Sequence, residues 1–268
     1  MPKLSIVLCE GPHDVAFISK ILKADLFKSK ENLPINDYPQ PISSMLINEV
    51  KETNIEELKF QELKKALLPS AILKKEEHFI FLYAIGGDSR KDIRKAFLST
   101  LISFIPEEGE IEILPTDTEL NLLYILDADN LGIPARINQI NEELENEIGV
   151  KPFNGVGLSK YKTLGLGIYI FSAEHGVGKL EDLLMPLMEE NNEDIFKEAK
   201  TFYNNFYDVD RDKRKKSDQS KAAIGISGQL QKAGMTNSVI IGQSDYITSE
   251  KIKRNEKCQE ILTFFSKI

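Results

Sequence analysis

The chain has 268 residues, of which 41% are hydrophobic and 28% charged, and its formal net charge is −8. This composition is ordinary for a globular protein that is long enough to bury a core, and the negative charge argues against a basic surface that coats nucleic acid. No apolar run approaches the roughly 20 residues that a membrane-spanning helix requires, so we expect no membrane partner.

The first apolar run, residues 4–9 (LSIVLC), leads directly into Glu10 and Gly11 without a small-residue cleavage site. We therefore interpret it as a strand and not as a signal peptide. The only cysteines are Cys9 and Cys258, which argues against a disulfide framework. A reducing cytoplasm is the location that this cysteine usage predicts.

The segment EGPHD joins this first strand to a helix. Gly11 permits a tight turn and Pro12 suits the first helical position, and apolar residues at 15, 18, 21 and 22 follow with helical spacing. Glu10 is thus expected at the carboxyl end of the strand and Asp14 in the first helical turn. His13 is expected to lie beside any metal site and not to bind the metal, because Mg²⁺ prefers oxygen.

Residues 28–77 interrupt the pattern, with prolines at 34, 39 and 41. Only residues 55–68 have the spacing of an amphipathic helix. We interpret 28–77 as a helical insertion between the first and second strands.

Strand and helix then alternate. Residues 79–85 form the second predicted strand, followed by Gly86-Gly87 and a helix on which Arg90, Lys91, Arg94 and Lys95 are expected to be exposed. Residues 120–126 and 165–172 form the third and fourth strands, each followed by a helix. Four strand–helix units predict an α/β fold with a parallel sheet flanked by helices. From about residue 189 the pattern is mainly helical, with a charged connector at 208–220.

The third strand ends in Asp127-Ala128-Asp129. Ligands of an open parallel sheet bind beyond the carboxyl ends of its strands, and two carboxylates there suit a hard divalent cation. The alternative is that both acids only turn the chain, because Asp is a common turn residue.

The order EG, then GG, then DAD on successive strand ends resembles the Toprim domain of topoisomerases, bacterial primases and recombination proteins. The resemblance covers roughly residues 4–184 and implies a Toprim domain at 1–187, with the 28–77 insertion, followed by a helical C-terminal extension at 188–268. Haloacid-dehalogenase-like phosphatases also place DxD after a strand, but they usually continue with Thr or Val, where this chain has Asn130.

The chain is most similar to the overcoming-lysogenization-defect (OLD) nuclease branch. That resemblance implies a metal-binding role for Glu181, in SAEHGVGKLEDLL, and a catalytic role for Lys221. Lysine and arginine at 214–216 keep the choice of basic residue open. OLD-like nucleases often carry an ATPase domain; no GxxxxGK[ST] run occurs here, so an ATPase would be a separate subunit.

The resemblance and the residues together predict a metal-dependent endonuclease. Five carboxylates are expected to bind two Mg²⁺ or Mn²⁺ ions about 3.5–4 Å apart: Glu10, Asp14, Asp127, Asp129 and Glu181. Glu10 is also expected to act as a general acid or base, and Lys221 to stabilise charge in the transition state. The basic side chains expected to hold the nucleic-acid backbone are Arg90, Lys91, Arg94, Lys95, Arg211, Arg214, Lys215 and Lys216.

Several alternatives remain open from the sequence. Asp14 and Glu181 are also explained as first-turn acids that favour a helix N-terminus, and Lys221 as a solvated lysine. The competing function is a catalytically inactive Toprim binding or regulatory subunit. The sequence distinguishes neither DNA from RNA nor a monomer from a homo-oligomer, and a role in phage defence follows from the resemblance alone.

Overall fold

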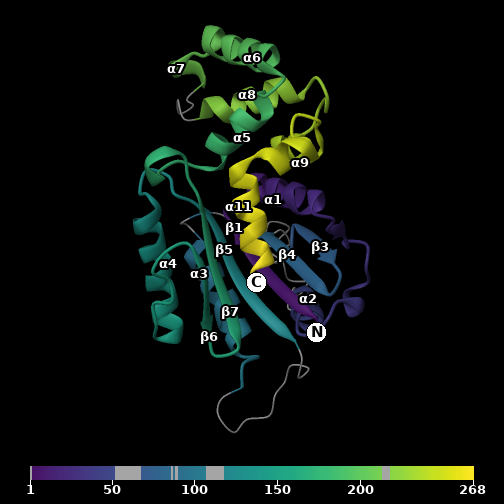
Figure 1. Ribbon diagram of the computed structural model, residues 1–268, viewed down its shortest axis with the longest axis vertical. Coiled ribbons are helices and arrows are strands. Elements are labelled where there is room, and N and C mark those ends of the chain that lie inside the picture. Colours follow the sequence, from purple (N-terminus) through teal and green to yellow (C-terminus); the bar gives the residue numbers. More distant parts are fainter. Residues whose placement is uncertain (1, 52–67, 86, 88–89, 107–117, 213–217) are drawn as a thin grey trace.

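The computed structural model describes residues 2–51, 68–85, 87, 90–106, 118–212 and 218–268. Within these residues one sheet has seven strands in the order β2-β3-β4-β1-β5-β7-β6 (Figure 1). The strands are β1 (Lys3–Cys9), β2 (Lys28–Ser29), β3 (Ala71–Lys75), β4 (His78–Ala84), β5 (Glu119–Asp127), β6 (Gly157–Tyr161) and β7 (Leu164–Phe171).

The four central strands β4, β1, β5 and β7 are parallel, and β2, β3 and β6 extend the sheet antiparallel at its edges. The predicted α/β class, with a largely parallel sheet and a helical extension, is confirmed. β2, β3 and β6 were not predicted. The two-residue turns Glu76-Glu77 and Lys162-Thr163 lack the Asn-Gly or Asp-Gly signal of a hairpin, although Glu76 and Lys162 have positive φ angles of 52° and 50°.

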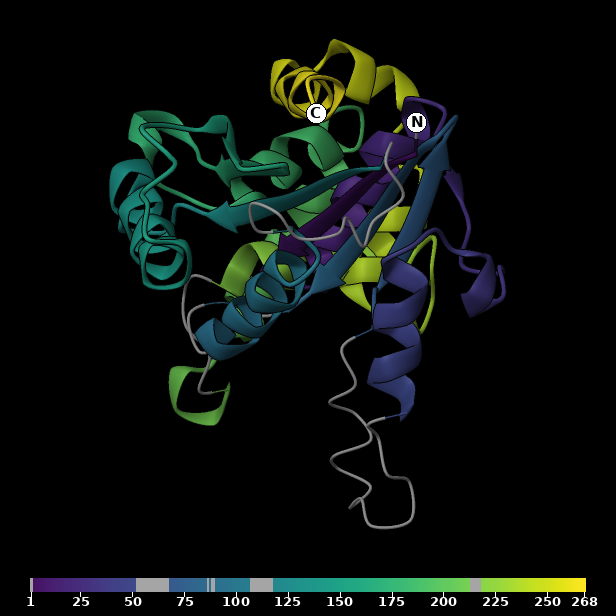
Figure 2. The same ribbon diagram turned by 90° about the horizontal axis from the view of Figure 1, so that it is seen from below.

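Helices cover both faces of the sheet (Figure 2). α2, α3 and α4 contribute to the core on one face, and α1 and α5 together with α8 to α11 on the other. The helices are α1 (Pro12–Ala24), α2 (Ile42–Lys51), α3 (Lys91–Ile102), α4 (Ile133–Ile148), α5 (Leu180–Glu189), α6 (Glu193–Phe206), α7 (Val209–Asp212), α8 (Gln219–Gly228), α9 (Asn237–Gln243), α10 (Ser249–Arg254) and α11 (Glu256–Ser266). Short 3₁₀ turns are found at Ile35–Asp37 and Glu174–Gly176.

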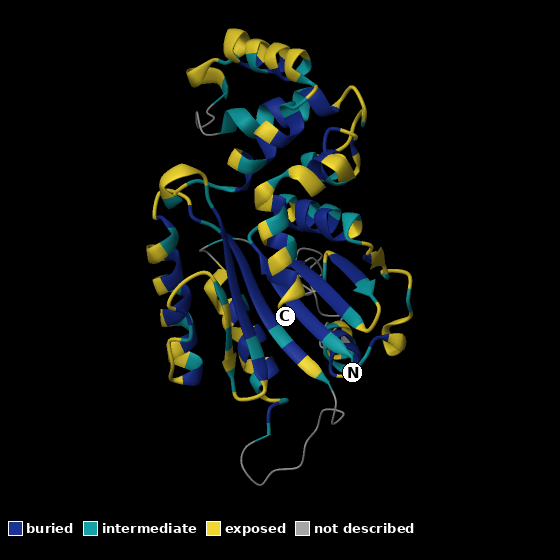
Figure 3. Cartoon of the chain, in the orientation of Figure 1, coloured by how far each residue is buried: buried dark blue, intermediate teal, exposed yellow. Residues whose placement is uncertain are grey.

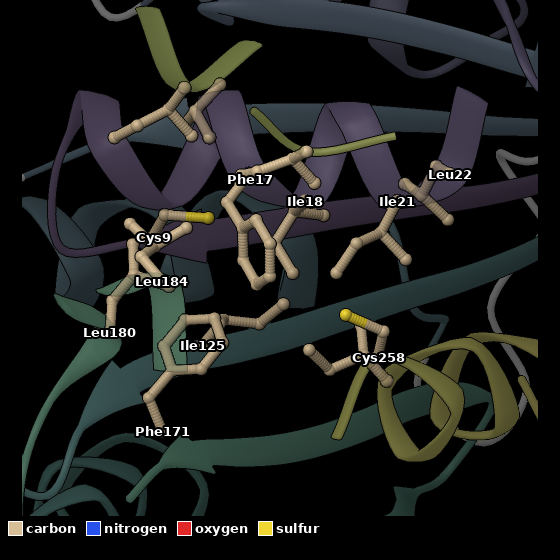
Figure 4. Close-up of a cluster of buried hydrophobic side chains, with 14 of the residues drawn as sticks. Cys9, Phe17, Ile18, Ile21, Leu22, Ile125, Phe171, Leu180, Leu184 and Cys258 are labelled. Carbon is tan, nitrogen blue, oxygen red and sulfur yellow. The ribbon is translucent and has the colours of Figure 1, made fainter. Parts of the chain in front are cut away.

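Successive side chains of each strand point to opposite faces of the sheet, which divides the core into these two layers. On β1, Val7 and Cys9 belong to the layer under α1, whereas Leu4, Ile6 and Leu8 belong to the opposite layer. Figure 4 shows the layer under α1, where side chains of α1, β5 and β7 meet Cys258 from α11. The C-terminal extension thus buries side chains in the same core as the strands, and the division at residue 187 stays a prediction.

The helices α5, α6, α7 and α8 form a lobe beyond the carboxyl ends of the central strands (Figure 1). Most residues of α6 in this lobe are exposed (Figure 3). Of the predicted insertion, α2 is observed, and the helix expected at 55–68 falls almost entirely outside the described residues. Among the described helices, none combines the length and apolarity that a membrane crossing needs.

Candidate active site

The carboxyl ends of adjacent central strands bring the first acidic residues together. Glu10 directly follows β1, and Asp127 is the last residue of the neighbouring β5. The backbone N–H of Asp127 donates to Glu10 Oε1 at 3.1 Å, and the N–H of Leu180, at the start of α5, donates to Asp127 Oδ1 at 2.9 Å. Segments distant in sequence are therefore joined through these two carboxylates.

Asp14 lies in the first turn of α1, as predicted. The backbone N–H of Gly11 donates to Asp14 Oδ2 at 2.8 Å, which orders the turn between β1 and α1. The residue is only 5% exposed, and its second oxygen, Oδ1, is buried without a hydrogen-bond partner in the described part of the chain. Helix capping explains the first oxygen and leaves the second unexplained.

Glu181 lies in the first turn of α5 and is buried. His13 Nδ1 lies 3.3 Å and Lys221 Nζ 3.7 Å from Glu181 Oε1. The turn before α5 depends on Gly178, whose φ is +108° and where an added Cβ would approach Asp182 Oδ2 to 2.7 Å. The expected position of His13, beside the acidic cluster, matches its contact with Glu181.

One cavity of ≈ 250 Å³ collects these groups. Its charged lining comes from the residue after β1 and from α1, β5, α5 and α8, and consists of Glu10, Asp14, Asp127, Glu181 and Lys221. We name this space the acidic cavity. Four of the five predicted carboxylates and the predicted lysine thus line one cavity.

The acids of the acidic cavity differ in how readily they ionise. Burial, together with the Glu10 and Glu181 carboxylates, raises the pKa of Asp14 to about 7 against the opposing hydrogen bond from Gly11. Burial raises the pKa of Asp127 to about 8, aided by repulsion from Asp14 and Glu10. Burial also acts to raise the pKa of Glu181, but the hydrogen bond to His13 and the charge of Lys221 outweigh it, so that pKa is lowered.

The structure does not bring Asp129 into the acidic cavity. Its φ of 48° and its paired backbone hydrogen bonds with Gly178 direct the chain away, and its side chain is 48% exposed. Asp129 Oδ2 instead accepts a hydrogen bond from Arg136 at 2.8 Å. The DxD motif therefore supplies one carboxylate to the cavity and one to an ion pair beside it.

Arg136 was missed by the sequence analysis. This α4 residue is 3% exposed, donates to the Asp127 carbonyl at 2.9 Å, and approaches Glu10 Oε1 to 3.8 Å. Nothing in the pattern of α4 separates it from an ordinary surface arginine, since its role depends on the packing of α4 against the end of β5.

The expectation that Arg94 is exposed is wrong. It is 3% exposed and makes two hydrogen bonds to Glu143, at 2.9 and 2.7 Å, and one to the Gly87 carbonyl at 3.2 Å. The charge of Arg94 is therefore used to fix α3 against α4. The helical pattern alone places Arg94 on the polar side of α3, but its hydrogen bonds to the Glu143 carboxylate of α4 bury it.

The other basic residues lie in three places. Lys91 and Lys95 line a groove between α3 and α4 that also contains acidic side chains, and Lys95 Nζ pairs with Glu147 at 2.8 Å. Arg90 is exposed at the start of α3, and Arg211 in α7 pairs with Asp212. Arg214, Lys215 and Lys216 lie outside the described residues. The acidic cavity itself includes only Lys221 of the predicted basic residues that the structure describes.

The donor set of the acidic cavity fits a hard divalent cation. All four acidic groups offer oxygen, Asp14 Oδ1 is buried without a hydrogen-bond partner among the described residues, and burial together with the neighbouring carboxylates raises the pKa values of Asp14 and Asp127. Within the described ranges, no three His, Cys, Asp or Glu side chains form a ready coordination sphere. The side chains of the cavity therefore have the chemistry of a cation site, but the described residues are not arranged in a coordination geometry.

Comparison with known proteins supports the fold and the family. The crystal structure of a hypothetical protein from Pyrococcus horikoshii OT3 superimposes with a TM-score of 0.55 and 14% identity, over 99% of this chain and 95% of that one. No curated protein matches the sequence at a significant level. A family model described as "Protein of unknown function (DUF3226)" matches residues 4–268, and the chain therefore belongs to the DUF3226 family.

Proposed function

We propose that this protein is a metal-dependent nuclease that hydrolyses phosphodiester bonds of nucleic acid in the acidic cavity. One observation carries the proposal: four carboxylates and one lysine, from four separate elements and the residue that follows β1, line the same small cavity at the carboxyl ends of the strands. A purely structural cluster of this kind is costly, because buried like charges repel one another.

A cation would relieve that repulsion. Mg²⁺ and Mn²⁺ take oxygen ligands, and a phosphodiester approaching four carboxylates would itself be repelled unless positive charge lay between them. Two such ions would polarise the phosphate and activate a water molecule. Glu10, Asp14 and Asp127 are the side chains that we propose to hold them, with Glu181 completing the set.

Three side chains of the protein are proposed to have further roles in the reaction. Lys221 is the cation of the cavity and is proposed to bind the scissile phosphate, where it stabilises negative charge as that charge develops. His13 contacts the same oxygen of Glu181 as Lys221 does and holds that carboxylate in place. Glu10, which joins β1 to β5, is proposed to accept or donate a proton as well.

The resemblance to Toprim domains, and to the OLD-like nucleases in particular, supports the same proposal through EGPHD, the glycine after β4, and Asp127. A separate ATPase subunit and a role in phage defence remain predictions of that resemblance. The metal-binding role predicted for Asp129 is the part of the pattern from which this chain departs, because Asp129 pairs with Arg136.

Metal binding is the first test. Saturating Mg²⁺ or Mn²⁺, at about 100 times the dissociation constant, should raise the melting temperature by roughly 5 °C or more, because the ion binds only the folded protein. Asp127→Asn should abolish most of this shift, whereas Asp194→Asn, on the exposed side of α6, should retain it. An unchanged melting temperature in the unaltered protein would instead favour a binding or regulatory subunit.

Cleavage is the second test. Purified protein is incubated with supercoiled plasmid, single-stranded DNA and tRNA in Mn²⁺, and the products are separated by electrophoresis. Cleavage that is present with Asp194→Asn and lost with Asp127→Asn would support the proposal. A cleavage activity that Asp127→Asn leaves intact would exclude the acidic cavity as its source.

A further inference from the structure

A larger cavity lies beside the acidic one, between α6 and α8. Its volume is ≈ 610 Å³, within the range of small-molecule binding pockets. One wall is aromatic: Phe202 and Phe206 are in ring contact at 5.0 Å, and Tyr203 and Tyr207 stack at 5.2 Å with their planes 18° apart. We name this space the aromatic cavity.

The rings of α6 are unusually accessible. Phe202 and Phe206 are 56% and 63% exposed, although burying such rings would be strongly favourable. The Tyr203 hydroxyl is buried and has no hydrogen-bond partner among the described residues. Two exposed phenylalanine rings beside an unsatisfied hydroxyl suit a ligand that is both flat and polar.

Lys221 joins the two cavities. It lines the acidic cavity, where its ammonium group approaches Glu181, and it also lines the aromatic cavity from α8. A chain whose phosphate contacted Lys221 would therefore have its neighbouring residue beside the α6 rings. The aromatic cavity and the proposed cleavage site thus share Lys221 as a lining residue.

We propose that the aromatic cavity binds unpaired bases of single-stranded nucleic acid, next to the phosphate held in the acidic cavity. This inference rests on the proposed nuclease function and names its substrate class. Bases in a duplex are stacked on each other and hide their faces, whereas unpaired bases stack on aromatic side chains. Such a site has two parts. Lys221 would contact the phosphate backbone of the nucleic acid, and the aromatic rings of α6 would contact its bases.

The absence of tryptophan from the chain permits a direct test. Phe206→Trp keeps an aromatic ring in the cavity wall and introduces a single fluorescent reporter. It is prepared in an Asp127→Asn background so that no substrate is cut. An oligothymidylate or oligouridylate of about 12 nucleotides should quench this fluorescence by stacking, and a blunt duplex of equal length should quench it far less.

The control is Leu158→Trp in the same background, because Leu158 is exposed on the edge strand β6 and lines neither cavity. Its fluorescence should not respond to the single strand. Equal quenching of both reporters, or quenching of the Phe206→Trp reporter by duplex as strongly as by single strand, would overturn the proposal.

Affinity gives an independent readout. Phe206→Ala in the Asp127→Asn background should weaken single-strand binding in fluorescence anisotropy by roughly fivefold to a hundredfold, and Leu158→Ala should not change it. Unchanged affinity in Phe206→Ala would overturn the inference even if the protein cuts duplex DNA, in which case the nuclease proposal would stand alone. Weakened affinity in a protein that neither binds metal nor cleaves would support the aromatic cavity and reject the nuclease.

Discussion

Arg136 neutralises part of the negative charge of the acidic residues at the carboxyl ends of the strands. One buried guanidinium contacts the Asp127 carbonyl, the Asp129 carboxylate and, at 3.8 Å, Glu10. Such a group cannot lose its proton, so its positive charge is permanent. The acidic cavity therefore has a fixed internal counter-charge on one side and Lys221 on the other.

Arg136→Met should destabilise the metal-free protein by about 3 kcal/mol, because removing one partner of a buried ion pair leaves the other charges uncompensated. The free energy of unfolding in urea, measured in EDTA, checks this. Arg254→Met is the matched control: Arg254 also pairs with a carboxylate, Glu190, but is 66% exposed, and its loss should cost less than about 1 kcal/mol. Equal losses for the two variants would contradict the role given to Arg136.

The stability of the metal-free protein should also depend on pH. Asp14 and Asp127 have pKa values raised to about 7 and about 8, so the folded state binds their protons more tightly than the unfolded chain, where the ordinary value is 3.8. The stability that they contribute is complete below about pH 4 and is lost as the pH rises through 7 and 8. We therefore expect the free energy of unfolding in EDTA to fall between pH 5 and pH 9.

Asp127→Asn should flatten this pH dependence, because asparagine does not titrate. His78 acts in the opposite sense: burial lowers its pKa to about 4, which costs stability as the pH falls below its ordinary value of 6.5. The contribution of His78 is the same in the unaltered protein and in Asp127→Asn, so it cancels when the free energies of unfolding of the two are subtracted. Identical pH profiles for the two proteins would show that Asp127 is already ionised in the folded metal-free state.

At the scale of elements, Lys251 joins α10 to α5. It is 4% exposed, and its ammonium group donates to the carbonyls of Leu187, Tyr246 and Glu190. Carbonyls in the last turn of a helix lack intrahelical partners, so a cation there satisfies groups that would otherwise be buried without hydrogen bonds. The end of α5 is thus fixed by the C-terminal extension.

Lys251→Met should lower the free energy of unfolding by about 2–4 kcal/mol, since it leaves buried carbonyls unsatisfied while keeping the apolar stem. Lys253→Met, exposed on the same helix, should change it by less than about 0.5 kcal/mol. Chemical denaturation of both variants makes the comparison. A small effect at Lys251 would mean that water readily replaces it at these carbonyls.

Elements were predictable where one physical signal dominated. The buried runs of β1, β4, β5 and β7 and the start of α1 at Pro12 were visible because apolar continuity and a helix-start residue coincide there. The antiparallel strands β3 and β6 were not, because their hairpin turns use Glu and Lys in place of glycine. Of these two, β6 lies at an edge of the sheet, and none of its residues is fully buried, which weakens its apolar pattern.

For the whole molecule, topology explains which site residues were predictable. Glu10 and Asp127 end adjacent parallel strands, so the prediction of a parallel sheet already places them together. Asp129 and Arg94 departed from expectation because their orientations depend on contacts with α4. Pairings between helices that are distant in sequence leave no periodic trace in the chain.

The position of Lys221 in the sequence determines when the acidic cavity is completed during synthesis of the chain. All four carboxylates of the acidic cavity precede residue 182, while the ammonium group that faces them arrives on α8, some way further along the chain. On the ribosome, the four carboxylates of the acidic cavity are therefore synthesised before Lys221, and the cavity lacks this ammonium group until α8 has docked. Under the nuclease proposal, cleavage of cellular nucleic acid would therefore be delayed until α8 has been made, after the central strands and α1 to α7.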